Sequence, residues 1–205
     1  MAASRSCIAC LAALCVAFLG ACSSANTFHA PAAAPSANAR EAQRLEGVAR
    51  TASSDGRYQD AARAYEDYLE ALAKDETRDP AAYANGLTQL GGCYYRLRFF
   101  AQAAASYREA IAFESARLGA DHEDVEGLLS ILAGVELRLN RPQEAERIQR
   151  QLLDSEHRKH ARGRRESATI LTNLAEALQA QGRHEEAERC RQEAKDIRHK
   201  LCDEC

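Results

Sequence analysis

The chain has 205 residues, with 27 lysines and arginines against 30 aspartates and glutamates, which gives a formal net charge of −3. This balance gives no support to nucleic-acid binding, because that function depends on clustered positive charge. The length is sufficient for one continuous hydrophobic core.

The N-terminal segment 1–22, MAASRSCIACLAALCVAFLGAC, predicts export. It contains one arginine, an apolar run too short to span a membrane, and small residues before Cys22. The ending FLGAC resembles a bacterial lipobox, which implies removal of signal peptide 1–21 and acylation of Cys22. By the same resemblance, Ser23 after the cysteine favours attachment to the outer membrane, facing the periplasm. An ordinary signal cleavage near Ala21, which would release a soluble secreted protein, remains the alternative.

Residues 22–40 are expected to be a flexible linker that carries the lipid. The segment is rich in alanine, proline, serine and asparagine, and Phe28 is its only large apolar residue. Such a composition buries too little apolar surface to offset the entropy lost on ordering.

Residues 41–205 carry a pattern with a constant period, which the evenly spaced Ala61, Ala103, Ala145 and Ala187 define. Three further positions keep the same period. The first position holds leucine in every copy: Leu45, Leu87, Leu129 and Leu171. The second holds valine or leucine: Val48, Leu90, Leu132 and Leu174. The third holds a small residue: Ala49, Gly91, Ala133 and Ala175. The pattern predicts stacked units at about 42–79, 84–121, 126–163 and 168–201.

Each unit is expected to be a pair of helices. In the last copy, Leu171, Leu174 and Leu178 lie at helical spacing and form one apolar stripe. Gly182 can end this helix, and a second one follows it. The small residues at the helix contacts allow the two helices to approach closely. The fold class is therefore predicted to be all-α.

The segment LTNLAEALQAQGRHEEAERCRQEAKDI resembles a tetratricopeptide repeat (TPR), and LGADHEDVEGLLSILAGVELRLNRPQEAERIQRQLL resembles the longer repeats of kinesin light chains. The resemblance covers roughly residues 42–200 and implies a right-handed α-solenoid of four helical hairpins. Four positions depart from the pattern: Arg98 and Asn140 replace turn glycines, Pro142 replaces an aromatic residue, and Glu136 lies at an apolar position. These departures predict less regular packing in the third hairpin.

The resemblance also implies that the first helices of the hairpins line a groove for a peptide or protein partner. The groove residues predicted in this way are Asn85, Thr88, Gln89, Gly92, Tyr95, Arg96, Ser130, Ile131, Gly134, Arg138, Thr169, Thr172, Asn173 and Glu176. Amides can pair with an extended backbone, and guanidinium groups with carboxylates. Gly91 and Gly92 either deepen the groove or only permit close helix packing.

One stretch of uneven charge has two interpretations. The connection at Asp121–Asp124 is acidic, whereas its counterpart one period later is basic. The basic residues are either a solvated surface or a docking patch for an anionic partner: Arg158, Lys159, Arg162, Arg164 and Arg165.

Cys202 and Cys205 follow the C-terminal end of a helix, which is unfavourable for a reactive thiolate. A disulfide between them, free thiols and an intermolecular bridge all remain open. Together with His199 they offer three zinc ligands without a fourth, so no metal site is expected. The sequence contains no phosphate loop and no hydrolase or metalloprotease motif, and neither a cofactor nor an enzymatic activity is expected.

The sequence thus favours a membrane-anchored periplasmic TPR lipoprotein that acts as a scaffold or adaptor for a protein or peptide partner. The alternative is a structural envelope protein that forms a homo-oligomer through its C-terminal helix.

Overall fold

Helical hairpins follow one another in the computed structural model, which describes residues 36–75, 79–159 and 165–203. All of these residues belong to one compact unit. The helices, in chain order, are α1 (Ala37–Ser54), α2 (Tyr58–Ala73), α3 (Pro80–Arg96), α4 (Phe100–Leu118), α5 (Glu123–Arg138), α6 (Pro142–Lys159), α7 (Arg165–Ala180) and α8 (His184–Asp203).

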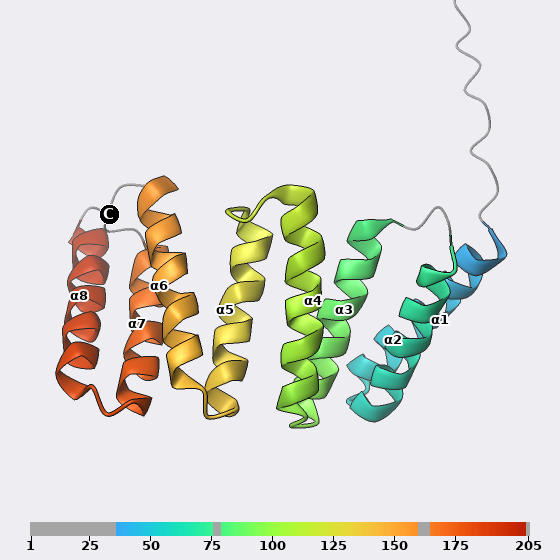
Figure 1. Ribbon diagram of the computed structural model, residues 1–205, viewed down its shortest axis with the longest axis horizontal. Helices are drawn as coiled ribbons and strands as arrows, with labels where there is room; N and C mark the ends of the chain where they lie inside the picture. The colour runs from blue at the N-terminus through green and yellow to red at the C-terminus, as the bar shows by residue number, and fades with distance from the viewer. Residues whose placement is uncertain (1–35, 76–78, 160–164, 204–205) are drawn as a thin grey trace, which may run out of the picture. The chain divides into compact units, whose positions relative to one another are not determined.

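The helices pack in the order of the chain. The members of each hairpin contact each other, and the second helix of one hairpin packs on the first helix of the next (Figure 1). The predicted all-α arrangement of consecutive hairpins is therefore confirmed. Within the described ranges, no helix has the length and apolar character needed to cross a membrane.

Helix α1 begins earlier than the sequence indicates. The predicted linker extends to residue 40, whereas the structure is helical from Ala37. Ser36 caps the helix, because its hydroxyl oxygen accepts a hydrogen bond from a backbone N–H of the first turn at 2.9 Å. The same hydroxyl donates to Asp75 at 3.2 Å, and the Asn38 amide donates to the Lys74 carbonyl oxygen at 3.0 Å. These bonds fix the first turn to the end of α2.

The turn inside each hairpin places one residue in the left-handed backbone conformation. This residue is glycine in the outer hairpins, Gly56 (φ 75°) and Gly182 (φ 76°), but Arg98 (φ 64°) and Asn140 (φ 57°) in the inner ones. The turn itself is unchanged by the substitution, since the N–H that follows Arg98 still bonds to the carbonyl of Tyr94 at 2.8 Å. An arginine there carries a steric cost that glycine does not.

Small residues set the spacing of the helices, both within the hairpins and between them. The four repeated alanines of the sequence pattern are all 0% exposed: Ala61, Ala103, Ala145 and Ala187. A Cβ atom added to Gly91 would lie 3.1 Å from the Tyr107 ring, and one added to Gly86 would lie 2.8 Å from the Tyr68 ring. Gly91 therefore permits close packing, which is one of the two alternatives left open by the sequence.

The first hairpin departs from the predicted core. Val48 is 48% exposed and Leu45 only half-buried, whereas the counterparts of Val48 are buried in the later hairpins: Leu90, Leu132 and Leu174. In those hairpins the first helix packs on the preceding hairpin. Among the described residues no helix precedes α1, so this part of its apolar stripe is left uncovered.

The third hairpin contains a charged residue in its core. Glu136 is 0% exposed; its carboxylate accepts a hydrogen bond from Arg108 of α4 and lies 3.7 Å from the guanidinium of Arg141. Pro142 is the first residue of α6, where its missing N–H is not needed by the helix. One of the sequence departures, Glu136, thus provides a buried carboxylate for an ion pair with Arg108 that joins the second and third hairpins.

Candidate partner-binding surfaces

Residues of α3, α5 and α7 form rows along the stack, because residues one repeat apart occupy the same place in successive hairpins. We call this the first-helix surface; it consists of Asn85, Thr88, Gln89, Gly92, Ser130, Ile131, Gly134, Thr169, Thr172, Asn173 and Glu176. One row contains Gln89, Ile131 and Asn173. Helices α5 and α7 contact each other directly, so their rows are neighbours.

The exposed side chains of this surface are polar, apart from one apolar residue. Asn85, Gln89 and Glu176 are exposed, Asn173 is half-buried, and Ile131 is 46% exposed. A Cβ atom added to Gly134 would meet no atom within 4 Å, so the surface is open at that point. The arrangement offers hydrogen-bonding groups and an apolar contact to a peptide laid across the helices.

The threonine hydroxyl groups of this surface donate hydrogen bonds within their own helices. The hydroxyl groups of Thr88 and Thr172 donate to carbonyl oxygens one helical turn earlier in their own helices, at 2.9 and 2.8 Å, and Thr169 does the same at 3.3 Å. The Thr172 hydroxyl also accepts a bond from Arg198 of α8 at 2.8 Å. Their donor capacity is therefore already used within the chain.

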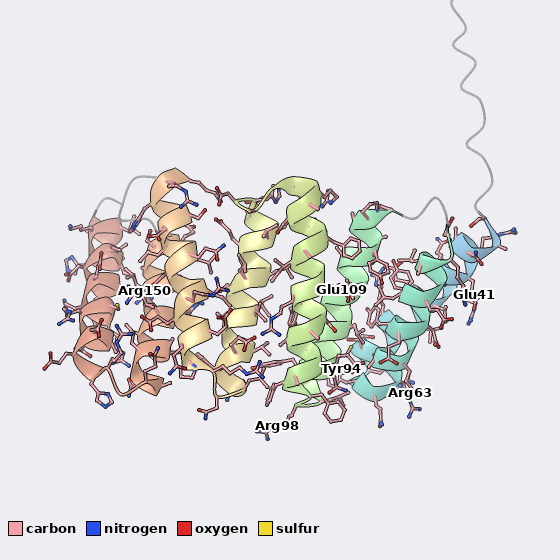
Figure 2. The ribbon with its side chains drawn as sticks, viewed as in Figure 1. Glu41, Arg63, Tyr94, Arg98, Glu109 and Arg150 are labelled. Atoms are coloured by element: carbon pink, nitrogen blue, oxygen red, sulfur yellow. The ribbon has the colours of Figure 1, made fainter. Side chains whose placement is uncertain are left out.

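Three predicted groove residues lie together at another place. Tyr95, Arg96 and Arg138, at the C-terminal ends of α3 and α5, line an open depression of about 400 Å³. The remaining lining residues were not predicted: Tyr58, Arg98 and Phe100. We call these six residues the arginine depression. Figure 2 shows Arg98 at the end of the hairpin where α3 and α4 meet.

The aromatic residues of the depression contact Arg96 and one another. The guanidinium carbon of Arg96 lies 5.0 Å from the centroid of the Tyr58 ring, a cation–π contact. The rings of Tyr95 and Phe100 meet edge to face, with centroids 5.5 Å apart.

The positive charge of the depression is not neutralised by any described residue. Within the part of the chain that the structure describes, no carboxylate forms an ion pair with Arg96, Arg98 or Arg138. By contrast, Arg183 at the last turn lies 2.7 Å from Glu146 and 2.6 Å from Glu186. The sequence did contain a signal for this site, because Arg96 and Arg138 are one repeat apart and Arg98 replaces a turn glycine.

Two cations of the predicted basic patch form ion pairs within the chain. Arg158 lies 3.1 Å from Asp121, and Lys159 lies 2.6 Å from Glu126. Stacking brings the acidic connection after α4 next to the end of α6, so these two cations are engaged within the chain. Arg165 is exposed, and Arg162 and Arg164 lie outside the described residues.

Three cysteines lie in the described ranges, and none of them is paired in a disulfide. Cys202 is exposed and free, whereas Cys205, like Cys22, lies outside those ranges. Burial raises the pKa of the Cys93 and Cys190 thiols, which disfavours their thiolate forms. No group of three or more potential metal ligands was found in the residues that could be searched.

Helix α8 presents a polar outer surface. Its buried side chains are small or apolar, with Ala187 and Ala194 at 0% exposure and Ile197 at 9%. From His184 to Lys200, every exposed side chain is polar or charged. Such a polar surface resembles that of the capping helices found in repeat stacks.

Comparison with known proteins agrees with this architecture. Models of the tetratricopeptide repeat match residues 45–80 and 167–204. The fold is similar to the kinesin light chain "nearly identical TPR-like repeats" from Podosopora anserina, with a TM-score of 0.70 and 19% identity over 78% of this chain and 76% of that chain. MamA is also similar, with a TM-score of 0.59 and 14% identity over 79% of this chain and 81% of that chain. No curated protein matches the chain.

The protein therefore has a TPR-like repeat fold of consecutive helical hairpins. Tetratricopeptide repeats lie in its first and last hairpins, and such repeats suggest protein partners.

Proposed function

We propose that this chain is a lipid-anchored scaffold of the bacterial periplasm that binds a protein or peptide partner across its first-helix surface. The observation that carries the proposal is the row of Gln89, Ile131 and Asn173, which offers two amides around an exposed apolar residue on successive hairpins. An extended peptide needs such a combination of backbone partners and apolar contact. The role requires neither a cofactor nor catalytic chemistry.

The binding surface can be tested by crosslinking in cells. A photo-crosslinking residue placed at Ile131 of the full chain should give a discrete adduct with the partner, which is weakened when Gln89 and Asn173 are both changed to alanine. The same crosslinker at Arg189, an exposed residue of α8, is the control. Equal adducts from both positions, or adducts that the double variant leaves unchanged, would show that the partner binds elsewhere.

The anchor rests on the sequence FLGAC and needs a separate test. Radiolabelled palmitate should be incorporated into the full chain but not into the Cys22→Ala variant, and the variant should leave the outer-membrane fraction. Several acyl chains on one residue provide lasting attachment, since each buried methylene contributes about 0.8 kcal/mol. An unlabelled wild-type chain would contradict the anchor without affecting the proposed binding surface.

A further inference from the structure

We infer that the arginine depression binds an acidic segment of the partner protein and holds its carboxylates with Arg96, Arg98 and Arg138. The inference rests on the proposed scaffold function and adds the chemistry of the partner. It also locates a second contact region, at the hairpin turns rather than along the first-helix surface.

The repeat register shows that the cations are confined to the two inner hairpins. Arg96 and Arg138 occupy one and the same repeat position, and the outer hairpins have Ser54 and Ala180 there. The fold does not need an arginine at this position, since the two outer hairpins form without one.

Arg98 adds an independent observation. Its φ of 64° belongs to the region that favours glycine, which is the residue found at the same place in the outer hairpins. Residues held in unfavourable backbone conformations gather at functional sites. What arginine adds at this turn is a guanidinium group that lines the depression beside Arg96 and Arg138.

The three guanidinium groups are available to a ligand. The described residues supply no carboxylate to any of them, although ion pairs between neighbouring turns of one helix are frequent elsewhere, as in Arg147 with Glu144 and Arg150 with Glu146. The stacking of Arg96 on Tyr58 holds one guanidinium in place before a ligand arrives. A preordered fork of N–H donors can bind a carboxylate through two parallel bonds.

The shape of the site favours a peptide segment over a small enclosed ligand. The arginines come from the end of α3, from the turn after it and from the end of α5, around an open depression of about 400 Å³. Because the three guanidinium groups come from three separate places, a segment with several carboxylates can contact all of them.

The test uses a fluorescein-labelled peptide with four glutamates, and a glutamine version of it, with the full chain purified in a nonionic detergent. Fluorescence anisotropy at low salt should show binding of the glutamate peptide only. Loss of one charge-assisted contact should weaken binding about tenfold in Arg98→Gly, and more in a variant with both Arg96→Gln and Arg138→Gln. Circular dichroism should show that the variants remain folded; Arg98→Gly introduces the residue that the outer turns already have.

The control variant is Arg189→Gln, which removes the same charge from an exposed position on α8. If Arg189→Gln weakens peptide binding as much as the variants of the arginine depression do, the peptide is attracted by positive charge in general, and the inference is overturned. Displacement of the peptide by equimolar inorganic phosphate would overturn it too, because the site would then bind small anions. If the glutamate peptide does not bind while the Ile131 crosslink persists, the partner chemistry is wrong but the scaffold proposal stands.

Discussion

The inner turns and the last turn of the repeat stack use arginine in opposite ways. In the arginine depression of the inner turns, Arg96, Arg98 and Arg138 have no carboxylate partner among the described residues. At the last turn, Glu146 accepts bonds from Arg183 and from the Gln181 amide, at 2.7 Å each. We call the latter set the Glu146 network; it consists of Glu146, Arg150, Gln181, Arg183 and Glu186.

The difference shows what decides the role of a turn arginine. The Glu146 side chain is only 13% exposed and reaches from the third hairpin to the fourth, so its ion pairs hold two repeats together. In the arginine depression the described residues supply no acid, and under our inference the same residue type serves recognition of another molecule. Substitutions should therefore destabilise the protein at the last turn and weaken binding at the inner turns.

The largest effect on stability is expected from Glu146→Ala. The change leaves Arg183 and Gln181 without their partner across the two hairpins. We expect the free energy of unfolding to fall by about 2 kcal/mol. This loss is smaller than for a fully buried ion pair, because the side chains of Arg150 and Arg183 reach solvent. Urea unfolding monitored by circular dichroism measures it. Glu144→Ala on the same helix removes a more exposed pair with Arg147 and should change stability by less than about 0.5 kcal/mol. Equal losses would mean that the network does not join the hairpins.

Acid should weaken the same network. Burial raises the pKa of Glu146, but hydrogen bonds from Gln181, Arg150 and Arg183 outweigh it, and the net pKa is lowered. A carboxyl group with a lowered pKa in the folded state stabilises the protein above its unfolded pKa of about 4.3 and loses that contribution as the pH falls through the folded value. The stability difference between the wild type and Glu146→Gln should thus be larger at pH 7 than at pH 3. A difference independent of pH would contradict the lowered pKa.

At the inner turn, the corresponding change should have the opposite sign. Arg98→Gly relieves the unfavourable backbone conformation and should raise the free energy of unfolding by about 1 kcal/mol, or the melting temperature by about 2–4 °C. Arg98→Ala is the matched control, because it removes the charge but retains a Cβ atom at positive φ. If the alanine variant gains as much as the glycine variant, the cause is the guanidinium and not the backbone.

Much of the fold could be predicted from the sequence, for a physical reason. Close helix packing needs small residues at fixed places, and the constant spacing of Ala61, Ala103, Ala145 and Ala187 records that need directly. Features that depend on a neighbour were less predictable. Val48 has the right residue type for the core, yet it is 48% exposed because its exposure depends on a preceding helix.

The candidate sites show the same limit. The register placed Tyr95, Arg96 and Arg138 on a binding surface, but the contribution of Arg98 became clear only when the turn was seen beside them. The pairing of Arg158 with Asp121 joins two distant parts of the chain. Such a pair follows from how one hairpin stacks on the next, and composition alone shows only two patches of opposite charge.

The smallest expected effect tests the reasoning about Arg98 itself. Asn140 has the same conformation one repeat later, with a φ of 57°, but asparagine tolerates the left-handed region through its short polar side chain. Asn140→Gly should therefore stabilise the protein by only a few tenths of a kcal/mol, clearly less than Arg98→Gly, in parallel urea titrations. If both substitutions gain equally, arginine is no more strained here than asparagine. The backbone conformation of Arg98 would then be no evidence for a function of this residue. The acidic-segment inference would depend only on the lack of described carboxylate partners for Arg96, Arg98 and Arg138.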